Sequence, residues 1–327
     1  MKILITGSAG HLGEALVRTL QRQGHEVVGT DVLPSATTHR VGSITDRDHV
    51  RRCMQGVEAV VHTATLHKPH VATHSRQAFV DTNITGTLHL LEEAAEAKVR
   101  AFVFTSTTSV FGDAMAPNAE APTPWITEEV VPIPKNIYGV TKVAAEDLCQ
   151  LFHRNQHLPC LILRTSRFFA EEDDHRDLRE AYADANIKTN EFLYRRVDLE
   201  DVVSAHLLAI EKVPALGFGR YIISATTPFT PDDLPALRTD APTVVRRRVP
   251  AYEAVYARLG WRMFPHLDRV YVNTKARMEL GWQPHHDFDT VLKRLENGQG
   301  PLSSLANQIG AKGYHSTKFS DGPYPVC

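Results

Sequence analysis

The chain has 327 residues, of which 43% are hydrophobic and 23% charged, the composition of an ordinary globular protein of about two domains. Its 36 basic and 38 acidic residues give a formal net charge of −2, which excludes the basic surface of a nucleic-acid-binding or anionic-membrane-binding protein. Four scattered cysteines exclude a disulfide framework, and no apolar run is as long as a signal peptide or membrane span requires. We therefore expect a cytoplasmic protein with reduced thiols and no nucleic-acid or membrane partner.

Strands and helices are predicted to alternate through the first half of the chain. The predicted strands are short, continuously apolar runs, and the predicted helices carry an apolar face with three-to-four-residue spacing. Because the strands do not alternate between apolar and polar residues, we predict an α/β protein whose parallel sheet is covered by helices on both faces. The predicted strands are 2–6, 26–31, 57–63, 101–106, 159–165 and 219–224, and the predicted helices are 12–23, 47–55, 76–97, 137–155 and 199–213.

Three segments carry no such periodicity. Residues 113–136 are proline-rich and polar, which predicts a loop. Residues 170–180 mix acidic and basic side chains, the usual pattern of a solvated surface segment. Residues 298–327 are rich in glycine, serine and proline, which predicts an extended or partly disordered tail.

Glycines follow the first predicted strand at a regular spacing. Gly7 permits a tight turn, Gly10 lets the backbone approach a pyrophosphate, and Gly13 lets the next helix pack closely on the sheet. The start of that helix offers N–H groups and a positive dipole end to phosphates. Asp31, at the end of the second predicted strand, can accept both hydroxyls of a ribose and repels a 2′-phosphate, which favours NAD over NADP. The alternative is a tight turn that serves packing alone.

Tyr138 and Lys142 share one face of the predicted helix 137–155, because they are four residues apart. A cation beside a phenol lowers the tyrosine pKa from about 10 toward neutral pH. Tyr138 is therefore a candidate general acid/base for interconverting a carbonyl and an alcohol. Hydroxyl side chains at residues 105–109 end the fourth predicted strand, at the sheet edge where ligands bind. One of them can hold the substrate oxygen while Tyr138 moves its proton.

The chain resembles an extended short-chain dehydrogenase/reductase of the NAD-dependent epimerase/dehydratase family, whose members act largely on nucleotide sugars. The resemblance spans about residues 1–295 and rests on motifs in the family's order, at residues 6–13, 42–46, 62–65, 83–87, 106–112, 138–142 and 275–284. It implies a Rossmann fold, a doubly wound parallel sheet with a smaller, discontinuous C-terminal substrate-binding part. It also implies NAD as cofactor, a sugar or sugar nucleotide as small-molecule substrate, and a homodimer formed through the helices near 84–97 and 137–155.

The resemblance assigns roles residue by residue. Thr107 takes the position of the family's catalytic Ser/Thr, Tyr138 is the acid/base, and Lys142 bridges the nicotinamide ribose and tunes Tyr138. The predicted cofactor-binding residues are Gly7, Gly10, His11, Leu12, Gly13, Asp31, Asp46, Ala64, Ser106, Tyr138, Lys142 and Thr165.

The resemblance also divides the chain. It implies an NAD-binding domain at residues 1–165 plus about 197–224, and a substrate-binding part at about 166–196 and 225–297. Residues 298–327 are left as the extended tail.

Departures from the family pattern bear on the substrate. Thr107 is followed by Thr108 and Ser109 where the dehydratases have Asp-Glu, so 4,6-dehydration is not expected. The segment 167–195 is short where the family clamps a nucleotide, which counts against a UDP- or dTDP-sugar. The candidate substrate residues are His67, Thr108, Arg167, Arg195 and Arg196, the arginines for an anionic group. Structural or surface salt bridges are the alternative for each arginine.

His67, His70 and His74 have the spacing of metal ligands, but the family needs no metal, and none is predicted. The leading hypothesis is an NAD-dependent epimerase or dehydrogenase that transfers hydride at a secondary alcohol or ketone of a sugar or nucleotide sugar. One alternative is an NAD(P)-dependent ketone or aldehyde reductase with a non-nucleotide substrate. Another is an NAD-binding regulator without turnover. The presence of Thr107, Tyr138 and Lys142 argues against it, because a regulator does not need an activated phenol.

Overall fold

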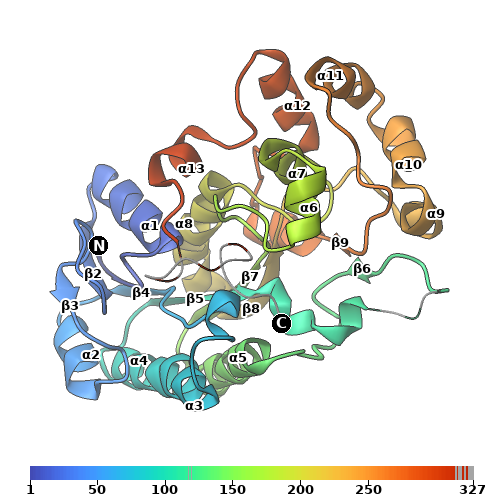
Figure 1. Cartoon of the computed structure of the whole chain (residues 1–327). Helices are drawn as coiled ribbons and strands as arrows, with labels where there is room; N and C mark the ends of the chain where they lie inside the picture. The colour runs from blue at the N-terminus through green and yellow to red at the C-terminus, as the bar shows by residue number, and fades with distance from the viewer. Residues whose placement is uncertain (117, 119, 314, 316–318, 320–321, 323–327) are drawn as a thin grey trace.

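A seven-stranded sheet, all of whose pairings are parallel, forms the centre of the computed structural model (Figure 1). Residues 1–116, 118, 120–313, 315, 319 and 322 are described. The strand order is β3-β2-β1-β4-β5-β7-β8. The strands are β1 Lys2–Thr6, β2 Glu26–Asp31, β3 Arg40–Val41, β4 Ala59–His62, β5 Ala101–Thr107, β7 Cys160–Thr165 and β8 Phe218–Ile223.

Helices cover both faces of this sheet, as Figure 1 shows. Helices α1 (His11–Arg22) and α8 (Leu199–Leu216) pack on one face, over a core that includes Ile3, Val61 and Val103. Helices α2 (Arg47–Cys53), α4 (Gly86–Glu96) and α5 (Ile137–Gln156) cover the other, over Leu4, Val60 and Phe102. Successive strand residues point to opposite faces, so burial on both sides requires the continuously apolar strands that the sequence shows. The predicted doubly wound Rossmann fold is confirmed.

The strand order reverses between β1 and β4, which are neighbours in the sheet. In doubly wound sheets a crevice for ligands opens at such a reversal, at the carboxyl ends of the strands. Thr6, His62, Thr107 and Thr165 are the last residues of β1, β4, β5 and β7, so their side chains meet along this edge.

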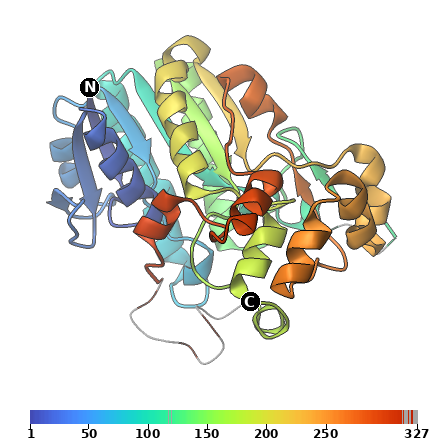
Figure 2. The ribbon, with the colours of Figure 1, turned by 90° about the horizontal axis from the view of Figure 1, so that it is seen from above.

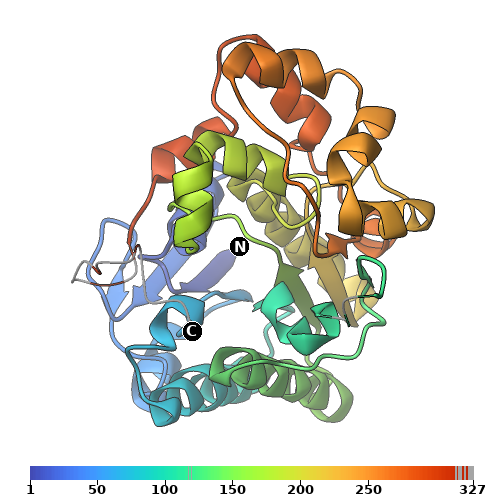
Figure 3. The same cartoon turned by 45° about the vertical axis from the view of Figure 1, so that its right-hand side comes forward.

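The remaining helices lie largely beyond this edge, where α9 to α12 gather in Figure 3. A small parallel sheet joins β6 (Trp125–Ile126) to β9 (Val270–Tyr271). Apolar residues from this region, such as Leu267 and Trp282, belong to the same buried cluster as the α1 face of the sheet. The predicted boundaries of a separate substrate-binding part therefore stay a prediction. The helices are α3 Arg76–Phe79, α6 Arg176–Ala181, α7 Asp184–Glu191, α9 Leu234–Thr239, α10 Ala241–Arg248, α11 Tyr252–Leu259, α12 Phe288–Glu296 and α13 Ser304–Ile309.

Several local predictions were wrong. The predicted helix 76–97 is interrupted by a π-helical turn at Val80–Thr85. The charge run at 170–180 is not a solvated segment throughout, because Glu171, Asp173 and Asp174 are buried by pairing with basic side chains.

The predicted extended tail contains α13, whose residues Ala306 and Ile309 are buried and which packs against α1 and α8 (Figure 2). Apart from residues 311–313, 315, 319 and 322, the tail beyond Gly310 lies outside the described residues.

Within the described residues, no helix combines the length and the apolar character needed to cross a bilayer.

Candidate active site

A cavity of about 430 Å³ lies at the carboxyl edge of the sheet. It runs from the glycine turn and Asp31, past the ends of β5 and β7, to Arg195 and Tyr271. Most predicted site residues line it, namely Gly7, Gly10, His11, Leu12, Gly13, Asp31, Ala64, His67, Ser106, Thr107, Thr108, Tyr138, Thr165, Arg167 and Arg195. Asp46, Lys142 and Arg196 are not among the lining residues of the described chain.

The glycine turn between β1 and α1 forms one wall. Gly7 has φ +71°, and a Cβ there would lie 2.7 Å from the backbone N of Ala64. A Cβ on Gly13 would lie 2.0 Å from the carbonyl oxygen of Gly7. Helix α1 starts directly after this turn, and its N-cap, Gly10, has no side chain to occupy the first N–H groups. These features fit the pyrophosphate of a dinucleotide.

Asp31 is held at the cavity wall by two backbone amides. The N–H of Ala9 donates to its Oδ2 at 3.0 Å, and the N–H of Leu33 donates to its Oδ1 at 3.0 Å. Each oxygen keeps a further lone pair, so the carboxylate can also accept hydroxyl donors from the cavity. This geometry is compatible with the predicted ribose contact.

Tyr138 and Thr107 bring two hydroxyls together on the cavity wall. Asn136 caps α5 by accepting the N–H of Gly139 at 3.1 Å, which fixes Tyr138 in the first turn of the helix. The phenol lies near the hydroxyl of Thr107 at the end of β5, which acts to lower the pKa of Tyr138 against the larger effect of burial. Thr107 also accepts the N–H of Ser109 at 3.1 Å. The two hydroxyls can thus reach one substrate oxygen.

Lys142 lies one turn along α5 from Tyr138. Its ammonium donates to the carbonyl oxygen of Thr105 at 2.7 Å and lies 3.9 Å from the centre of the Phe104 ring. Burial lowers the pKa of Lys142 to about 7 and raises the pKa of Tyr138 to about 12. The predicted lowering of the tyrosine pKa is therefore wrong for this structure, because desolvation of the phenol prevails and the ammonium is directed at the backbone.

The hydroxyls of Ser106 and Thr165 hydrogen-bond to the protein behind the cavity wall. The hydroxyl of Ser106 donates to Glu146 Oε1 at 2.5 Å, and Arg164 binds the same carboxylate, its Nη2 2.7 Å from Oε2. The hydroxyl of Thr165 donates to the carbonyl oxygen of Ser106 at 3.1 Å. Both hydroxyls are thus engaged with the protein and hold β5 and β7 in place, while parts of the two residues face the cavity.

The three arginines predicted to meet an anionic substrate are all in ion pairs. Arg196 is 1% exposed and donates to Glu191 at 2.7 Å, outside the lining of the cavity, so for this residue the structure favours the salt-bridge alternative. Arg167 and Arg195 line the cavity, and Arg195 pairs with Glu191 at 2.8 Å.

The aromatic ring of His67 also lines the cavity and stacks on Phe169 at 5.6 Å between ring centres. Burial holds the pKa of His67 well below its usual value, so the ring is neutral at neutral pH. Its neighbour His70 packs edge-on against it at 4.7 Å. Where three possible metal ligands do meet in the described chain, at residues 173–175 and at Asp198, Glu200 and His286, these histidines take no part.

Comparison with known proteins places the chain in a family. The family described as "NAD dependent epimerase/dehydratase family" matches residues 3–223, more than half of the chain. This chain belongs to that family. This confirms the predicted family and its cofactor, NAD. It also confirms the prediction that the protein belongs to a family of NAD-dependent enzymes.

Two curated relatives match about half of the chain. A UDP-glucose 4-epimerase of Erwinia amylovora is 30% identical over 165 residues, which are 45% of this chain and 47% of that protein. A 3-beta-hydroxysteroid dehydrogenase of Mycolicibacterium neoaurum is 32% identical over 156 residues, which are 44% of this chain and 41% of that protein. The match thus spans less than half the length of either relative.

A solved structure extends the similarity to nearly the whole fold. It is a short-chain dehydrogenase/reductase superfamily protein from Agrobacterium tumefaciens with bound NAD, 25% identical, with a TM-score of 0.65. The alignment covers 91% of this chain and 96% of that one.

Asp46, predicted to contact the cofactor, lies outside the lining of the cavity. Its Oδ1 accepts the N–H of His49 at 3.1 Å and caps α2, and this hydrogen bond lowers the pKa of Asp46. Gly42, Ser43 and Ile44 line the cavity instead. The acidic residue at the end of the motif caps a helix and does not line the cavity.

Sequence reasoning missed Glu171, which is 7% exposed. Its Oε1 lies 2.7 Å from Nε2 of His11 in the glycine turn and accepts the backbone N–H groups of Lys312 and Gly313 at 2.9 and 3.1 Å. Burial favours the neutral acid, but the hydrogen bond and charge of His11 together with backbone N–H donors outweigh it and lower the pKa of Glu171 to about 2. Partners 160 and 141 residues apart leave no local signal.

Replacing Asp31 by serine is expected to relax the preference for NAD. The carboxylate repels a 2′-phosphate and the hydroxyl does not, so the ratio of kcat/KM for NAD to that for NADP should fall about tenfold or more. Steady-state kinetics with both cofactors measure the ratio. Asp46→Ser is the matched control: it removes a carboxylate outside the cavity lining, keeps a helix cap and should leave the ratio unchanged. An unchanged ratio in Asp31→Ser would refute the role given to Asp31.

Proposed function

We propose that this protein is an NAD-dependent epimerase or dehydrogenase that transfers hydride at a secondary alcohol or ketone of a sugar or nucleotide sugar. The observation that carries the proposal is the pair of neighbouring hydroxyls, Thr107 and Tyr138, on the wall of a cavity that also holds the glycine turn and Asp31. The two curated relatives support the shared part of this chemistry, because their names describe an epimerase and a dehydrogenase.

The raised pKa of Tyr138, about 12, keeps the phenol protonated at neutral pH. When a ketone is reduced, Tyr138 donates this proton to the carbonyl oxygen as the C–H bond forms. The oxidation of an alcohol is the reverse step: the phenolate form of Tyr138, whose own proton has first left to solvent, takes the hydroxyl proton as hydride leaves the carbon. Thr107 holds that oxygen, and the fixed first turn of α5 holds the phenol toward it. Bound NAD supplies the hydride acceptor or donor next to the substrate carbon.

An assay of net cofactor change separates the two activities. An epimerase regenerates its NAD, so incubation with a substrate should convert the sugar without lasting absorbance from NADH, and NAD should co-purify with the protein. A dehydrogenase should accumulate NADH in step with ketone. We expect epimerisation. Chromatography of the sugar products measures it. Protein that binds NAD but converts no sugar and reduces no ketone would contradict the proposal and favour the regulatory alternative.

The homodimer that the resemblance implies and the cytoplasmic location that the composition predicts stay part of the proposal. Val140 and Leu151 support a contact through α5, because these apolar side chains are 49% and 38% exposed.

A further inference from the structure

Four cationic side chains line the cavity beyond the ends of β5 and β7: Lys68, Arg167, Arg195 and Arg269. Such a group would suit the diphosphate of a nucleotide sugar, because guanidinium and ammonium groups bind phosphate oxygens strongly. Each of the four, however, already forms an ion pair with a carboxylate of this chain.

Of the carboxylates in these ion pairs, Asp174 is the one that lines the cavity. Its Oδ1 accepts from Arg167 Nη1 at 2.8 Å, and its Oδ2 accepts from Lys68 Nζ at 2.6 Å. The side chain is only 3% exposed. Burial favours its neutral form, but the charges of Arg167 and Lys68 outweigh burial and hold the pKa of Asp174 well below its usual range. An ionised carboxylate therefore sits between two cations, as a phosphate group would.

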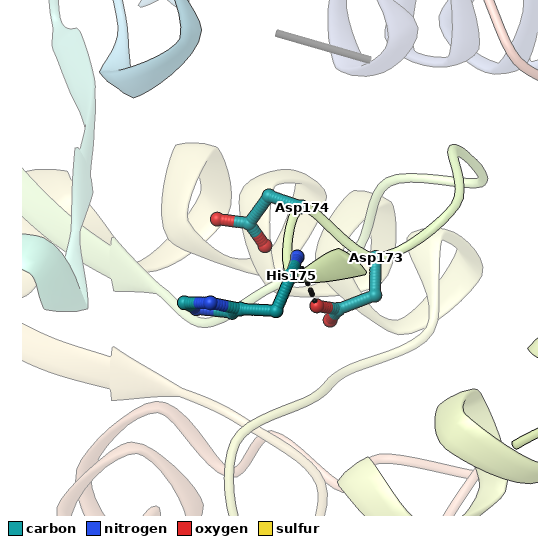
Figure 4. A group of neighbouring side chains, drawn as sticks. All are labelled: Asp173, Asp174 and His175. Atoms are coloured by element: carbon teal, nitrogen blue, oxygen red, sulfur yellow. Dashed lines mark hydrogen bonds between the residues drawn. The ribbon is translucent and has the colours of Figure 1, made fainter. Parts of the chain in front are cut away.

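Two further carboxylates complete the pairing behind the wall. Asp173 lies 3.2 Å from Arg167 and 3.3 Å from Arg195, and Glu191 lies 2.8 Å from Arg195. Figure 4 shows Asp173 and Asp174 beside His175, whose backbone N–H donates to Asp173 at 2.8 Å. The three could ligate a cation, but both carboxylates are already bound by basic side chains. The acidic run is thus one half of a buried ion network.

The rest of this end of the cavity is aromatic and apolar. Phe168 and Phe169 line it, with their ring centres 4.4 Å apart, together with Leu66 and Tyr271. Such walls bury the face of a ring, and each cation that lines this end of the pocket is already held by a carboxylate of the chain.

We propose that Asp174 occupies the anion position of the substrate pocket, so that the substrate is an uncharged cyclic secondary alcohol or ketone without a diphosphate. The inference rests on the proposed hydride transfer and narrows its substrate. A diphosphate could bind only by displacing a buried, doubly paired carboxylate or by lying against it. Both are unfavourable, because breaking a buried ion pair leaves an unpaired charge and like charges repel strongly away from water.

A binding titration tests the anion position without any turnover. The protein is first saturated with NAD, so that the cofactor's own phosphate site is filled, and is then titrated with inorganic pyrophosphate and with UDP-glucose by calorimetry. Wild-type protein should bind both with Kd above about 1 mM. Asp174→Asn removes the negative charge between Arg167 and Lys68 at constant size, and should lower the Kd for pyrophosphate about tenfold or more. Glu172→Gln, at the exposed neighbour, is the matched control and should behave as wild type.

Two results would overturn the inference. One is wild-type binding of UDP-glucose with Kd below about 0.1 mM. The other is an Asp174→Asn protein that folds but binds pyrophosphate no better than Glu172→Gln. Should Asp174→Asn not fold, the wild-type titration alone decides, since weak binding supports the inference and tight binding refutes it.

A turnover panel separates this inference from the proposed function. The uncharged arms of the panel are two kinds of test substrate, free hexoses and cyclohexanediols, and its charged arm is UDP-glucose. The Tyr138→Phe variant is the blank, a control protein that should not turn over any of them. Conversion of either uncharged arm supports the inference and identifies a sugar or an alicyclic alcohol. Conversion of UDP-glucose would refute it and leave the proposed function intact. No conversion of any arm above the blank would contradict the proposed function, and the titration would still decide the anion position.

Discussion

Replacing Tyr138 by phenylalanine is expected to reduce kcat about 100- to 10,000-fold while leaving the Kd for NAD unchanged. The variant loses one hydroxyl, the group that lies near Thr107 and is proposed to exchange a proton with the substrate oxygen. The ring, which is 8% exposed, keeps its packing. Steady-state turnover and a separate NAD titration measure the two quantities.

Tyr252→Phe is the matched control for that change. Tyr252 is also buried, at 5% exposed, but its hydroxyl makes only a long contact of 3.4 Å with the carbonyl oxygen of Pro242, outside the cavity. Its loss should leave kcat within about twofold, since a weak neutral hydrogen bond contributes little. If Tyr138→Phe retained activity at the level of Tyr252→Phe, proton transfer by Tyr138 would be excluded.

The parts of the fold that follow from short stretches of sequence could be predicted. Continuous apolar runs give buried parallel strands, and the spacing of Gly7, Gly10 and Gly13 after the first run gives the turn and the helix that follows. Among the strands, β3, β6 and β9 were not predicted, because they have two residues each and are too short to show any periodicity. The π-helical turn at Val80–Thr85 likewise interrupts a helical pattern that continues on both sides.

The site was predictable only in part, because several of its properties depend on partners far apart in the chain. The spacing of Tyr138 and Lys142 predicts that they share one face of α5. It does not predict the direction of the ammonium, which donates to the carbonyl oxygen of Thr105. Asp174 can be buried because Lys68 pairs with it. The two residues are 106 positions apart in the chain, so no local pattern shows this pairing. A run of charged residues is usually exposed to solvent. The run at 170–180 is partly buried because the fold brings basic side chains from distant parts of the chain against its carboxylates.

Replacing Gly13 by alanine is expected to weaken NAD binding about 10- to 100-fold, the equivalent of the 1–3 kcal/mol that overpacking costs. The new Cβ would lie 2.0 Å from the carbonyl oxygen and 2.7 Å from the carbonyl carbon of Gly7. Gly7 cannot move away freely, because it already lies against Ala64 and adopts φ +71°. The turn must therefore open, and the N–H groups at the start of α1 move away from the position of the pyrophosphate.

Two further alanine variants grade the effect. A Cβ on Gly10 would lie 3.2 Å from the same oxygen, a tight contact that a small shift relieves, whereas a Cβ on Gly300 meets nothing within 4 Å. Gly300→Ala should bind NAD as wild type does. Calorimetric titration with NAD and thermal unfolding without it separate binding from stability. If Gly13→Ala lowered Tm but left the Kd for NAD unchanged, the glycine turn would serve packing alone. A loss of affinity larger than the loss of stability would instead show that the spacing of the glycines shapes a phosphate site, because the same added methyl group then costs more with the cofactor bound than without it.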